Sequence, residues 1–333
     1  MSKQSKEGMG LADIAKSIPN LKTEIISTNI FVSDFILKGG LELGSSIQLV
    51  GESGVGKSTI SLQLAKQICN QGKNVVYVDS EGSVTNELLK TIGLEDFMNN
   101  RFFLIKEPTF KKVDDYLCKF IATGEISMII IDSLAGLVHE GFTNLKDSIS
   151  STTNNTSYNS KNLTQFISKF KSLATLNKFC LVMINQYRYS VNMMVGSQKK
   201  EYGSKVVRYS SDIIIKISNI KKHVDFKGMA KAFNGIELEL EVIKSNKSAP
   251  EESIPFALHY GKGISNLINK IYALIKLKII EQKGSYYQFK YNDKAVYEQG
   301  LANFYNKLIE LDVDLSEHDD KINEYYKIIN EIK

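Results

Sequence analysis

The sequence predicts an α/β protein with a mainly parallel central sheet, a short helical segment before the sheet and a small α+β unit after it. Two observations predict this class. Apolar strand-like runs alternate with helix-like segments, and a glycine-rich turn joins the first run of the core to a helix. The strand-like runs lie at 48–50, 74–78, 128–131, 179–184 and 212–217. A chain of 333 residues is long enough for one large core and a smaller appendage.

Composition and charge exclude several classes of protein. The net charge of +5 is modest, so it neither predicts nor opposes binding to nucleic acid. Cys69, Cys118 and Cys180 are widely spaced, which argues against a zinc site and a disulfide framework and favours a reducing compartment. Residues 1–9 lack the apolar core of a signal peptide, and no window resembles a membrane span. We therefore expect a cytoplasmic protein without a membrane partner.

The glycine-rich turn matches the complete pattern GxxxxGK[ST]. The matching residues are Gly51, Glu52, Ser53, Gly54, Val55, Gly56, Lys57 and Ser58, followed by Thr59. In such a turn the backbone N–H groups point at phosphate oxygens, the lysine reaches the β and γ phosphates, and the serine hydroxyl binds Mg²⁺. A glycine-rich surface loop with a chance lysine is the alternative. The strand-like run before the turn and the helix-like segment at 58–69 favour a nucleoside triphosphate site.

Acidic residues end two of the other predicted strands. Asp132 follows the run at 128–131, the position at which a Walker B carboxylate holds a metal ion through water. Asp79 and Glu81 follow the run at 74–78, and Glu81 is the candidate general base that polarises the attacking water. Each carboxylate could instead cap the segment that follows it, and for Asp79 that alternative stays open.

Two polar segments and a late change of pattern complete the outline. Residues 147–160 are too polar to bury a face, and residues 192–204 lack apolar periodicity, so we expect a loop in each place. After about residue 265 an amphipathic helix, a strand at 286–291 and a further helix through Leu308 predict a small separate α+β unit.

With these elements in order, the chain resembles the bacterial RecA recombinase family, including its phage-encoded relatives, from about residue 21 to 308. The resemblance rests on the turn described above and on six further short segments. They are Glu24-Ile25-Ile26-Ser27-Thr28, Gly39-Gly40-Leu41, Asp79-Ser80-Glu81, Ile131-Asp132-Ser133, Met183-Ile184-Asn185-Gln186 and His259-Tyr260-Gly261-Lys262-Gly263-Ile264. It implies an N-terminal oligomerisation segment at 1–20, a P-loop ATPase core at 21–264 and a C-terminal domain at 265–333.

The resemblance also assigns roles within the ATP site. It implies that Lys57, Ser58 and Thr59 bind phosphate and Mg²⁺, that Glu81 activates water, that Asp132 supports the metal through water, and that Gln186 senses the γ phosphate. It implies that Lys244 and Lys247 reach the ATP of a neighbouring protomer, although helix-end or surface lysines are the alternative. Leu88 stands where the family has an aromatic residue that stacks on adenine, so the resemblance leaves base selectivity open.

Two DNA-binding loops are implied, at about 143–161 and 187–207. The second is basic, which suits phosphate contacts, and carries apolar residues that could wedge between bases. Its candidate DNA-binding residues are Arg188, Tyr189, Met194, Val195, Gly196, Lys199, Lys200, Gly203, Ser204, Lys205 and Arg208. A solvated charged loop is the alternative. The family's paired glycines appear here as Gly203-Ser204, which reduces backbone freedom.

The function implied is that of an ATP-dependent recombinase, which forms a homo-oligomeric filament on single-stranded DNA and exchanges strands with homologous duplex. ATP and Mg²⁺ are the implied cofactors. One alternative is a regulatory or helicase-like ATPase of the same fold without strand exchange. Another is a protein that covers single strands and has lost ATP turnover, against which intact Lys57, Glu81 and Asp132 argue.

Overall fold

The computed structural model describes residues 24–140, 152–192, 196–226, 233–246, 253–259, 263–291 and 294–315. Its strands are β1 Ile25–Ile26, β2 Leu41–Glu42, β3 Ser46–Gly51, β4 Asn74–Asp79, β5 Phe102–Ile105, β6 Ile126–Asp132, β7 Cys180–Asn192, β8 Gly196–Glu201, β9 Ile213–Phe226, β10 Phe233–Ser245, β11 Ser253–His259, β12 Gly263–Ile264, β13 Glu281–Lys283, β14 Tyr286–Tyr291 and β15 Lys294–Gln299. Its α-helices are α2 Phe31–Leu37, α3 Lys57–Asn70, α4 Asn86–Ile92, α5 Phe110–Ala122, α6 Thr152–Asn177, α7 Ser204–Ser210, α8 Asn266–Lys276 and α9 Leu301–Glu310. None of the helices in these ranges is long and apolar enough to cross a membrane.

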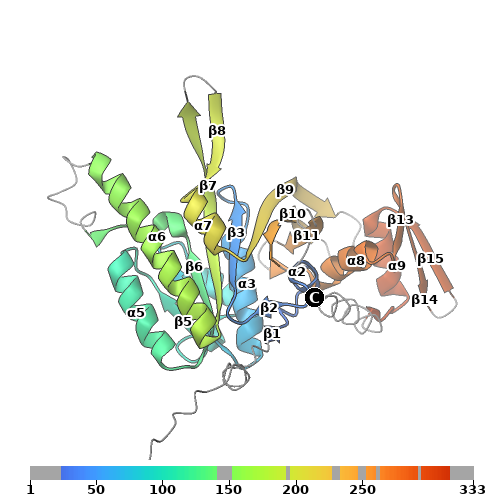
Figure 1. Ribbon diagram of the computed structural model, residues 1–333. Coiled ribbons are helices and arrows are strands. Elements are labelled where there is room, and N and C mark those ends of the chain that lie inside the picture. The colour runs from blue at the N-terminus through green and yellow to red at the C-terminus, as the bar shows by residue number, and fades with distance from the viewer. Residues whose placement is uncertain are drawn as a thin grey trace, which may run out of the picture.

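One large mixed sheet organises the molecule. Its strand order is β12-β11-β10-β9-β3-β7-β6-β4-β5, and every pairing from β9 to β5 is parallel. The strands β10, β11 and β12 extend the sheet antiparallel beyond β9. The predicted class, α/β with a mainly parallel sheet, is confirmed. Because the parallel strands share one direction, the carboxyl ends of β3, β4 and β6 lie at one edge, and β7 runs past this edge into the hairpin with β8 (Figure 1).

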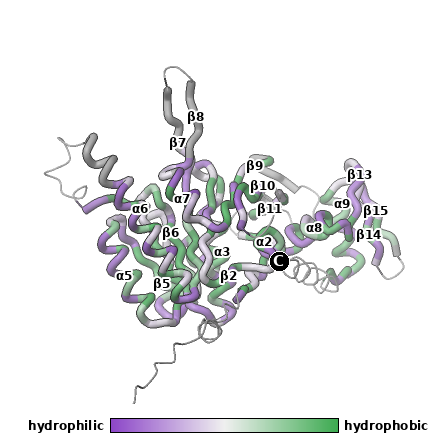
Figure 2. Tube along the Cα trace, in the orientation of Figure 1, coloured by the Kyte–Doolittle hydropathy of each residue, from purple (hydrophilic) through white to green (hydrophobic). Residues whose placement is uncertain are grey.

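Alternation along the strands buries both faces of the sheet. Val75 and Tyr77 of β4 face the side covered by α3, whereas Val76 and Val78 belong to the cluster formed with α5 and α6. Such nearly continuous apolar strands are typical of a parallel sheet between two helical layers. Figure 2 shows hydrophobic stretches along the central strands and hydrophilic patches on the outer helices.

The prediction of a loop at 192–204 is wrong, because this segment contains a β-strand and the start of a helix. The structure places β7 and β8 in an antiparallel hairpin, with Tyr187 opposite Glu201 and Asn192 opposite Gly196, followed directly by α7. In Figure 1 this hairpin projects away from the body of the molecule. Residues 192–204 show no apolar alternation, so the sequence pattern did not indicate the second strand of the hairpin. Met194 and Val195 lie outside the described residues.

The prediction of a loop at 147–160 is wrong from residue 152 onward, where the structure has a helix. Residues from Thr152 onward belong to α6, whose first turns project past α5 in Figure 1. The segment at 141–151 lies outside the described residues, as does the N-terminal segment at 1–23. The polar composition of residues 152–160 is compatible with a helix end that extends beyond the sheet, because an exposed turn needs no apolar stripe.

The C-terminal elements lie where the sequence pattern predicted them. The helix α8 packs on α2 and β11, and burial of Ile268, Ile271 and Leu274 anchors it there. Beyond it, β13, β14 and β15 form a separate antiparallel sheet, and α9 packs on this sheet through Phe304 and Leu308. Figure 1 shows this unit at the end of the molecule opposite α5 and α6.

A buried carboxyl group fixes the entry of the chain into the core. Asp34 of α2 accepts hydrogen bonds from the Thr28 backbone N–H at 2.7 Å, the Thr28 hydroxyl at 2.6 Å and the Ser27 hydroxyl at 2.6 Å. Burial raises the pKa of Asp34 to about 6, and these hydrogen bonds oppose the rise. The folded protein therefore binds a proton here at a higher pH than the unfolded chain does.

This carboxyl group makes stability depend on pH. Since the pKa is higher in the folded state, protonation favours folding, and that contribution is lost as pH rises from the unfolded value of 3.8 through about 6. In the wild type we expect the free energy of unfolding to fall by roughly 2 to 3 kcal/mol over this pH range because of Asp34. Asp34→Asn cannot titrate, so this fall should be absent from the variant. Urea unfolding at pH 4.5 and pH 7 measures it. Asp115→Asn, at an exposed position of α5, is the control and should keep the wild-type pH dependence. If the free energy of unfolding changes equally between the two pH values in wild type and in Asp34→Asn, the prediction is contradicted.

Candidate nucleotide site and the adjoining hairpin

The glycine-rich turn forms a phosphate-binding loop between β3 and α3. Gly54 and Gly56 have φ angles of 73° and 95°, a region that side chains with a Cβ rarely adopt. At Gly51 a Cβ atom would lie 2.6 Å from the Ile217 carbonyl oxygen, so only glycine fits where β3 meets β9. The turn thus leads the chain directly into the N-terminus of α3, where free backbone N–H groups and the helix dipole attract an anion.

Lys57 opens α3 and turns back over the loop. Its Nζ donates to the Gly51 carbonyl at 3.0 Å and to the Glu52 carbonyl at 2.6 Å. Burial lowers the pKa of Lys57, while the nearby carboxylates of Asp132, Glu81 and Glu52 act in the opposite direction. The amine is therefore held beside the loop by carbonyl oxygens, which phosphate oxygens could replace with stronger charge-assisted hydrogen bonds.

The metal-side residues come from three neighbouring elements. Asp132, at the end of β6, accepts a hydrogen bond from the Tyr77 hydroxyl at 2.5 Å and another from Ser58. Burial raises the pKa of Asp132, and these two hydrogen bonds counteract the rise. The Tyr77 hydroxyl also lies 3.2 Å from the Ser61 hydroxyl, so β4, α3 and β6 are joined here. A hydroxyl and a carboxylate in contact beside a phosphate loop fit a magnesium ion held by Ser58 directly and by Asp132 through water. Among the described residues no group of three or more His, Cys, Asp or Glu forms a metal site of its own.

Glu81 and Gln186 meet at the same edge. The Gln186 amide donates to Glu81 Oε1 at 2.9 Å, and the Ser133 hydroxyl donates to the same oxygen. Glu81 is otherwise exposed, as a base that must reach a water molecule would be. Gly136 passes so close that a Cβ there would lie 2.8 Å from Glu81 Cγ.

Asp79 has a different environment from Glu81, two residues later. It is buried, and its two carboxylate oxygens accept the backbone N–H groups of Ser83 at 3.0 Å and Val84 at 2.9 Å. This is the capping geometry that the sequence left open for Asp79. Each of its oxygens accepts one backbone N–H, and these two hydrogen bonds hold the turn after β4.

Gln186 also belongs to the base of the hairpin. Its backbone carbonyl accepts a hydrogen bond from the Tyr202 N–H at 3.0 Å, and the adjacent Asn185 amide donates to the Tyr202 carbonyl at 2.9 Å. The side chain of Gln186 thus contacts Glu81 while its backbone closes the hairpin. One residue joins the candidate catalytic carboxylate to the candidate DNA-binding element.

The basic residues of the second segment are distributed over the hairpin and α7. The backbone register places Arg188 opposite Lys200 and Tyr189 opposite Lys199. Lys205 and Arg208 lie on the exposed side of α7, and Gly203 caps its N-terminus at a φ of 61°, with Ser204 as its first residue.

Lys244 lies far from the phosphate loop of its own chain. It pairs with Ile214, which lies beside Gln48 near the start of β3, whereas the loop follows the end of that strand. Its Nζ donates to the carbonyls of Arg208 at 2.8 Å and Ser211 at 2.5 Å, at the C-terminus of α7. The structure therefore shows a helix-end contact for Lys244 within one chain. Lys247 lies outside the described residues.

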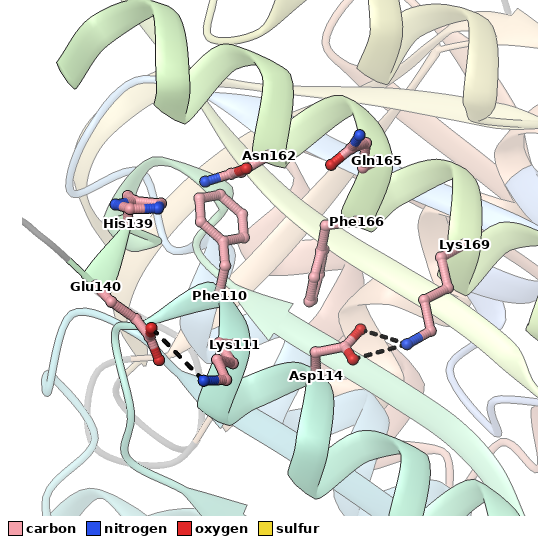
Figure 3. A pocket seen from close by; sticks show the side chains of 9 residues that line it. All are labelled: Phe110, Lys111, Asp114, His139, Glu140, Asn162, Gln165, Phe166 and Lys169. Carbon is pink, nitrogen blue, oxygen red and sulfur yellow. Dashed lines mark hydrogen bonds and ion pairs between the residues drawn. The ribbon is translucent and has the colours of Figure 1, made fainter. Parts of the chain in front are cut away.

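A second pocket, of about 360 Å³, lies between α5 and α6 and contains none of the nucleotide-site residues. Figure 3 shows part of its polar lining: Lys169 pairs with Asp114 at 2.7 Å and Lys111 with Glu140 at 3.9 Å, and Phe110 and Phe166 also line the pocket. Because each of these charges has a partner of opposite sign, the pocket shows no charge reserved for a ligand. The candidate nucleotide site is the one at the carboxyl edge of the sheet.

Several residues of this site were missed from the sequence. Tyr77, Ser133 and Gly136 contact Asp132 or Glu81 only because separate strands end together. The signal for Ser133 was its place directly after the Walker B carboxylate. Nothing in the local sequence distinguishes Tyr77 from any other buried aromatic residue of a strand.

The fold and the loop together define a P-loop nucleotide-binding protein of the α/β class. Residues 6–265 match the model of the RecA N-terminal domain, and the chain belongs to the RecA family. It is 30% identical to Protein RecA of Rickettsia prowazekii over 94% of this chain and 86% of that protein. It is 29% identical to Protein RecA of Rickettsia canadensis over 94% and 85%, and 25% identical to that of Mycoplasma genitalium over 85% and 81%.

Proposed function

We propose that this protein is an ATP-dependent DNA recombinase, which assembles as a filament on single-stranded DNA and exchanges strands with homologous duplex. The observation that carries the proposal is the double role of Gln186. Its side chain contacts Glu81 while its backbone closes the basic hairpin. A change at the nucleotide that moves Gln186 therefore also moves the base of the hairpin. A nucleotide-binding protein without a DNA-coupled cycle has no need of this connection.

The residues of the nucleotide site have separable tasks. When bound, ATP with Mg²⁺ supplies the phosphoanhydride whose hydrolysis resets the assembly. Lys57, which now contacts the loop carbonyls, and the N-terminus of α3 would hold phosphate, and Ser58 with Asp132 would hold the metal, directly and through water. Glu81, held by Ser133 and Gln186, is placed to accept a proton from the attacking water. Gln186 would lose or gain its bond to Glu81 according to whether the γ phosphate is present.

DNA binding is assigned to the hairpin and α7. Arg188 and Lys200 share one cross-strand position, and Lys205 and Arg208 add exposed positive charge at the foot of the hairpin. Contacts of this kind bind the phosphate backbone without reading the sequence, so binding should be tolerant of sequence and sensitive to salt. Pairing between strands would supply specificity. ATP and DNA are both cytoplasmic, and we place the activity there.

Assembly into a filament accounts for features that a monomer does not use. Within its own chain the Lys244 amine contacts the carbonyls at the end of α7, and we assign it to the nucleotide of a neighbouring protomer. The strand β5 pairs with β4 on one side and with no other strand among the described residues. Tyr116 and Tyr209 are 44% and 78% exposed, although large apolar residues are usually covered. An open sheet edge and exposed aromatic side chains suit contacts between protomers.

ATP hydrolysis with and without single-stranded DNA tests the proposal. We expect DNA to raise turnover by about ten-fold or more, and Arg188→Ala to reduce that stimulation several-fold while turnover without DNA stays within about two-fold. Rising salt should weaken the stimulation, with a shallower salt slope for Arg188→Ala than for wild type. The control Lys283→Ala, in the C-terminal sheet, should behave as wild type.

The same measurement separates the alternatives. Turnover that ignores DNA would contradict the recombinase and favour a regulatory ATPase of this fold. DNA binding without turnover would favour a protein that only covers single strands. DNA-stimulated turnover leads to a strand-exchange assay with homologous and heterologous duplex, and failure with both would leave a DNA-dependent ATPase that lacks recombinase activity.

A further inference from the structure

A buried amide lies in the strand that leads to the phosphate loop. Gln48 of β3 is three residues before Gly51, is fully buried, and has β7 on one side and β9 on the other. Its two ends contact different elements. The Gln48 Nε2 donates to Glu201 Oε2 at 3.3 Å, and its Oε1 lies 3.4 Å from the Ser211 hydroxyl, which donates to the Val207 carbonyl at 2.7 Å. Glu201 ends β8 of the hairpin, and Ser211 directly follows α7.

Glu201 is the partner that extends this contact to the surface. Its side chain is only 9% exposed, and its other oxygen accepts from Arg208 Nη1 of α7 at 3.4 Å. Tyr187 is its cross-strand neighbour, and burial together with the Glu201 charge raises the pKa of Tyr187 to about 12. The carboxylate therefore lies in a poorly hydrated place, where its partners matter more than they would in water.

These contacts form a continuous polar connection from the candidate DNA-binding surface to the phosphate loop. It runs from Arg208 to Glu201, from Glu201 to Gln48, and along β3 to Gly51. The contact between Gln186 and Glu81 leaves the hairpin through β7, whereas this one leaves it through β8. The two use different side chains, and they meet where Gly51 of β3 pairs with Gln186 of β7.

We propose that Gln48 and Glu201 are positioning residues, which make the hairpin and α7 move with the phosphate-loop strand and so transmit DNA binding to ATP turnover. The inference rests on the proposed function, because it takes the hairpin and α7 to bind DNA. Its physical basis is the cost of separation. If the hairpin moved alone, the Gln48 amide would stay buried without its acceptor, which is unfavourable because a buried donor would lose its hydrogen bond.

A charge-exchange set of variants tests the coupling. Glu201→Ala removes the link at its outer end. Gln48→Glu places two carboxylates against each other, and adding Glu201→Gln to it restores an amide–carboxylate pair of reversed direction that can still accept from Arg208 and Ser211. Glu107→Ala is the matched control, because that glutamate is also largely buried and hydrogen-bonded but lies on the loop before α5. ATP turnover with and without single-stranded DNA is measured for each variant, together with thermal unfolding.

We expect Glu201→Ala to lower the stimulation by DNA about five-fold or more, with turnover in the absence of DNA within about two-fold of wild type. Gln48→Glu should lose the stimulation, and the double exchange should recover most of it. If Gln48→Glu does not fold, Glu201→Ala with Gln48→Leu carries the test.

Wild-type stimulation in Glu201→Ala would overturn this inference and leave the proposed function intact. So would an equal loss in Glu107→Ala, or an equal fall of turnover with and without DNA. Absence of DNA stimulation in the wild type would instead overturn the proposed function.

Discussion

Glu81→Gln should reduce ATP turnover by about 100-fold or more while leaving ATP binding and folding unchanged, because general bases contribute about 10²- to 10⁴-fold. The substitution keeps the shape of the side chain and an oxygen that can accept from Ser133 and Gln186. It removes only the ability to take a proton from water. Steady-state hydrolysis in the presence of single-stranded DNA, with nucleotide binding measured separately, checks the prediction.

Asp79→Asn is the sharpest control, since this second carboxylate belongs to the same strand end. Its oxygens accept two backbone N–H groups, and an amide would turn one acceptor into a donor facing the N–H of Ser83 or Val84. We expect a loss of about 1 to 3 kcal/mol in the free energy of unfolding and near-normal turnover of the folded protein. Lost turnover in Asp79→Asn, with normal turnover in Glu81→Gln, would reverse the two assignments.

Lys57→Met should weaken ATP binding by about 100-fold, because hydrogen bonds to a charged group contribute about 1.5 to 3 kcal/mol each and 1.4 kcal/mol is ten-fold in affinity. Without nucleotide the variant should be about as stable as wild type. The amine contacts only two loop carbonyls, and burial of its charge, which lowers its pKa, is itself unfavourable.

A thermal shift titration separates these two effects. ATP with Mg²⁺ should raise the unfolding temperature of the wild type, since a ligand that binds only the folded state stabilises it, and should not raise that of Lys57→Met at the same concentration. Lys66→Met, on the same helix but beside Gly93, is the control and should respond as wild type does. An equal shift in Lys57→Met would show that the loop amides alone bind the phosphates.

Much of this protein follows from its sequence because the relevant physics is local. The alternation of apolar strands with helices fixes the layers, and the glycines of the loop are required by backbone angles that few other residues adopt. Asp132 and Glu81 could be found because each follows a strand, and parallel strands end at one edge. The family resemblance then supplied Gln186, whose local sequence gives no reason to expect a role.

Tertiary structure decided what periodicity could not. The first half of β7 was predicted as a strand, but residues 192–204 show no apolar alternation and were predicted as a loop, although β8 pairs there with β7. Asp79 and Glu81 are two residues apart and chemically alike, yet one receives backbone N–H groups and the other the side chains of Ser133 and Gln186. The sequence by itself determined the fold class and the phosphate loop, because these depend on local backbone and strand order. Only the folded chain determined which carboxylate is free to act and how Gln48 meets Glu201, because side chains 153 positions apart come together only through the pairing of the strands.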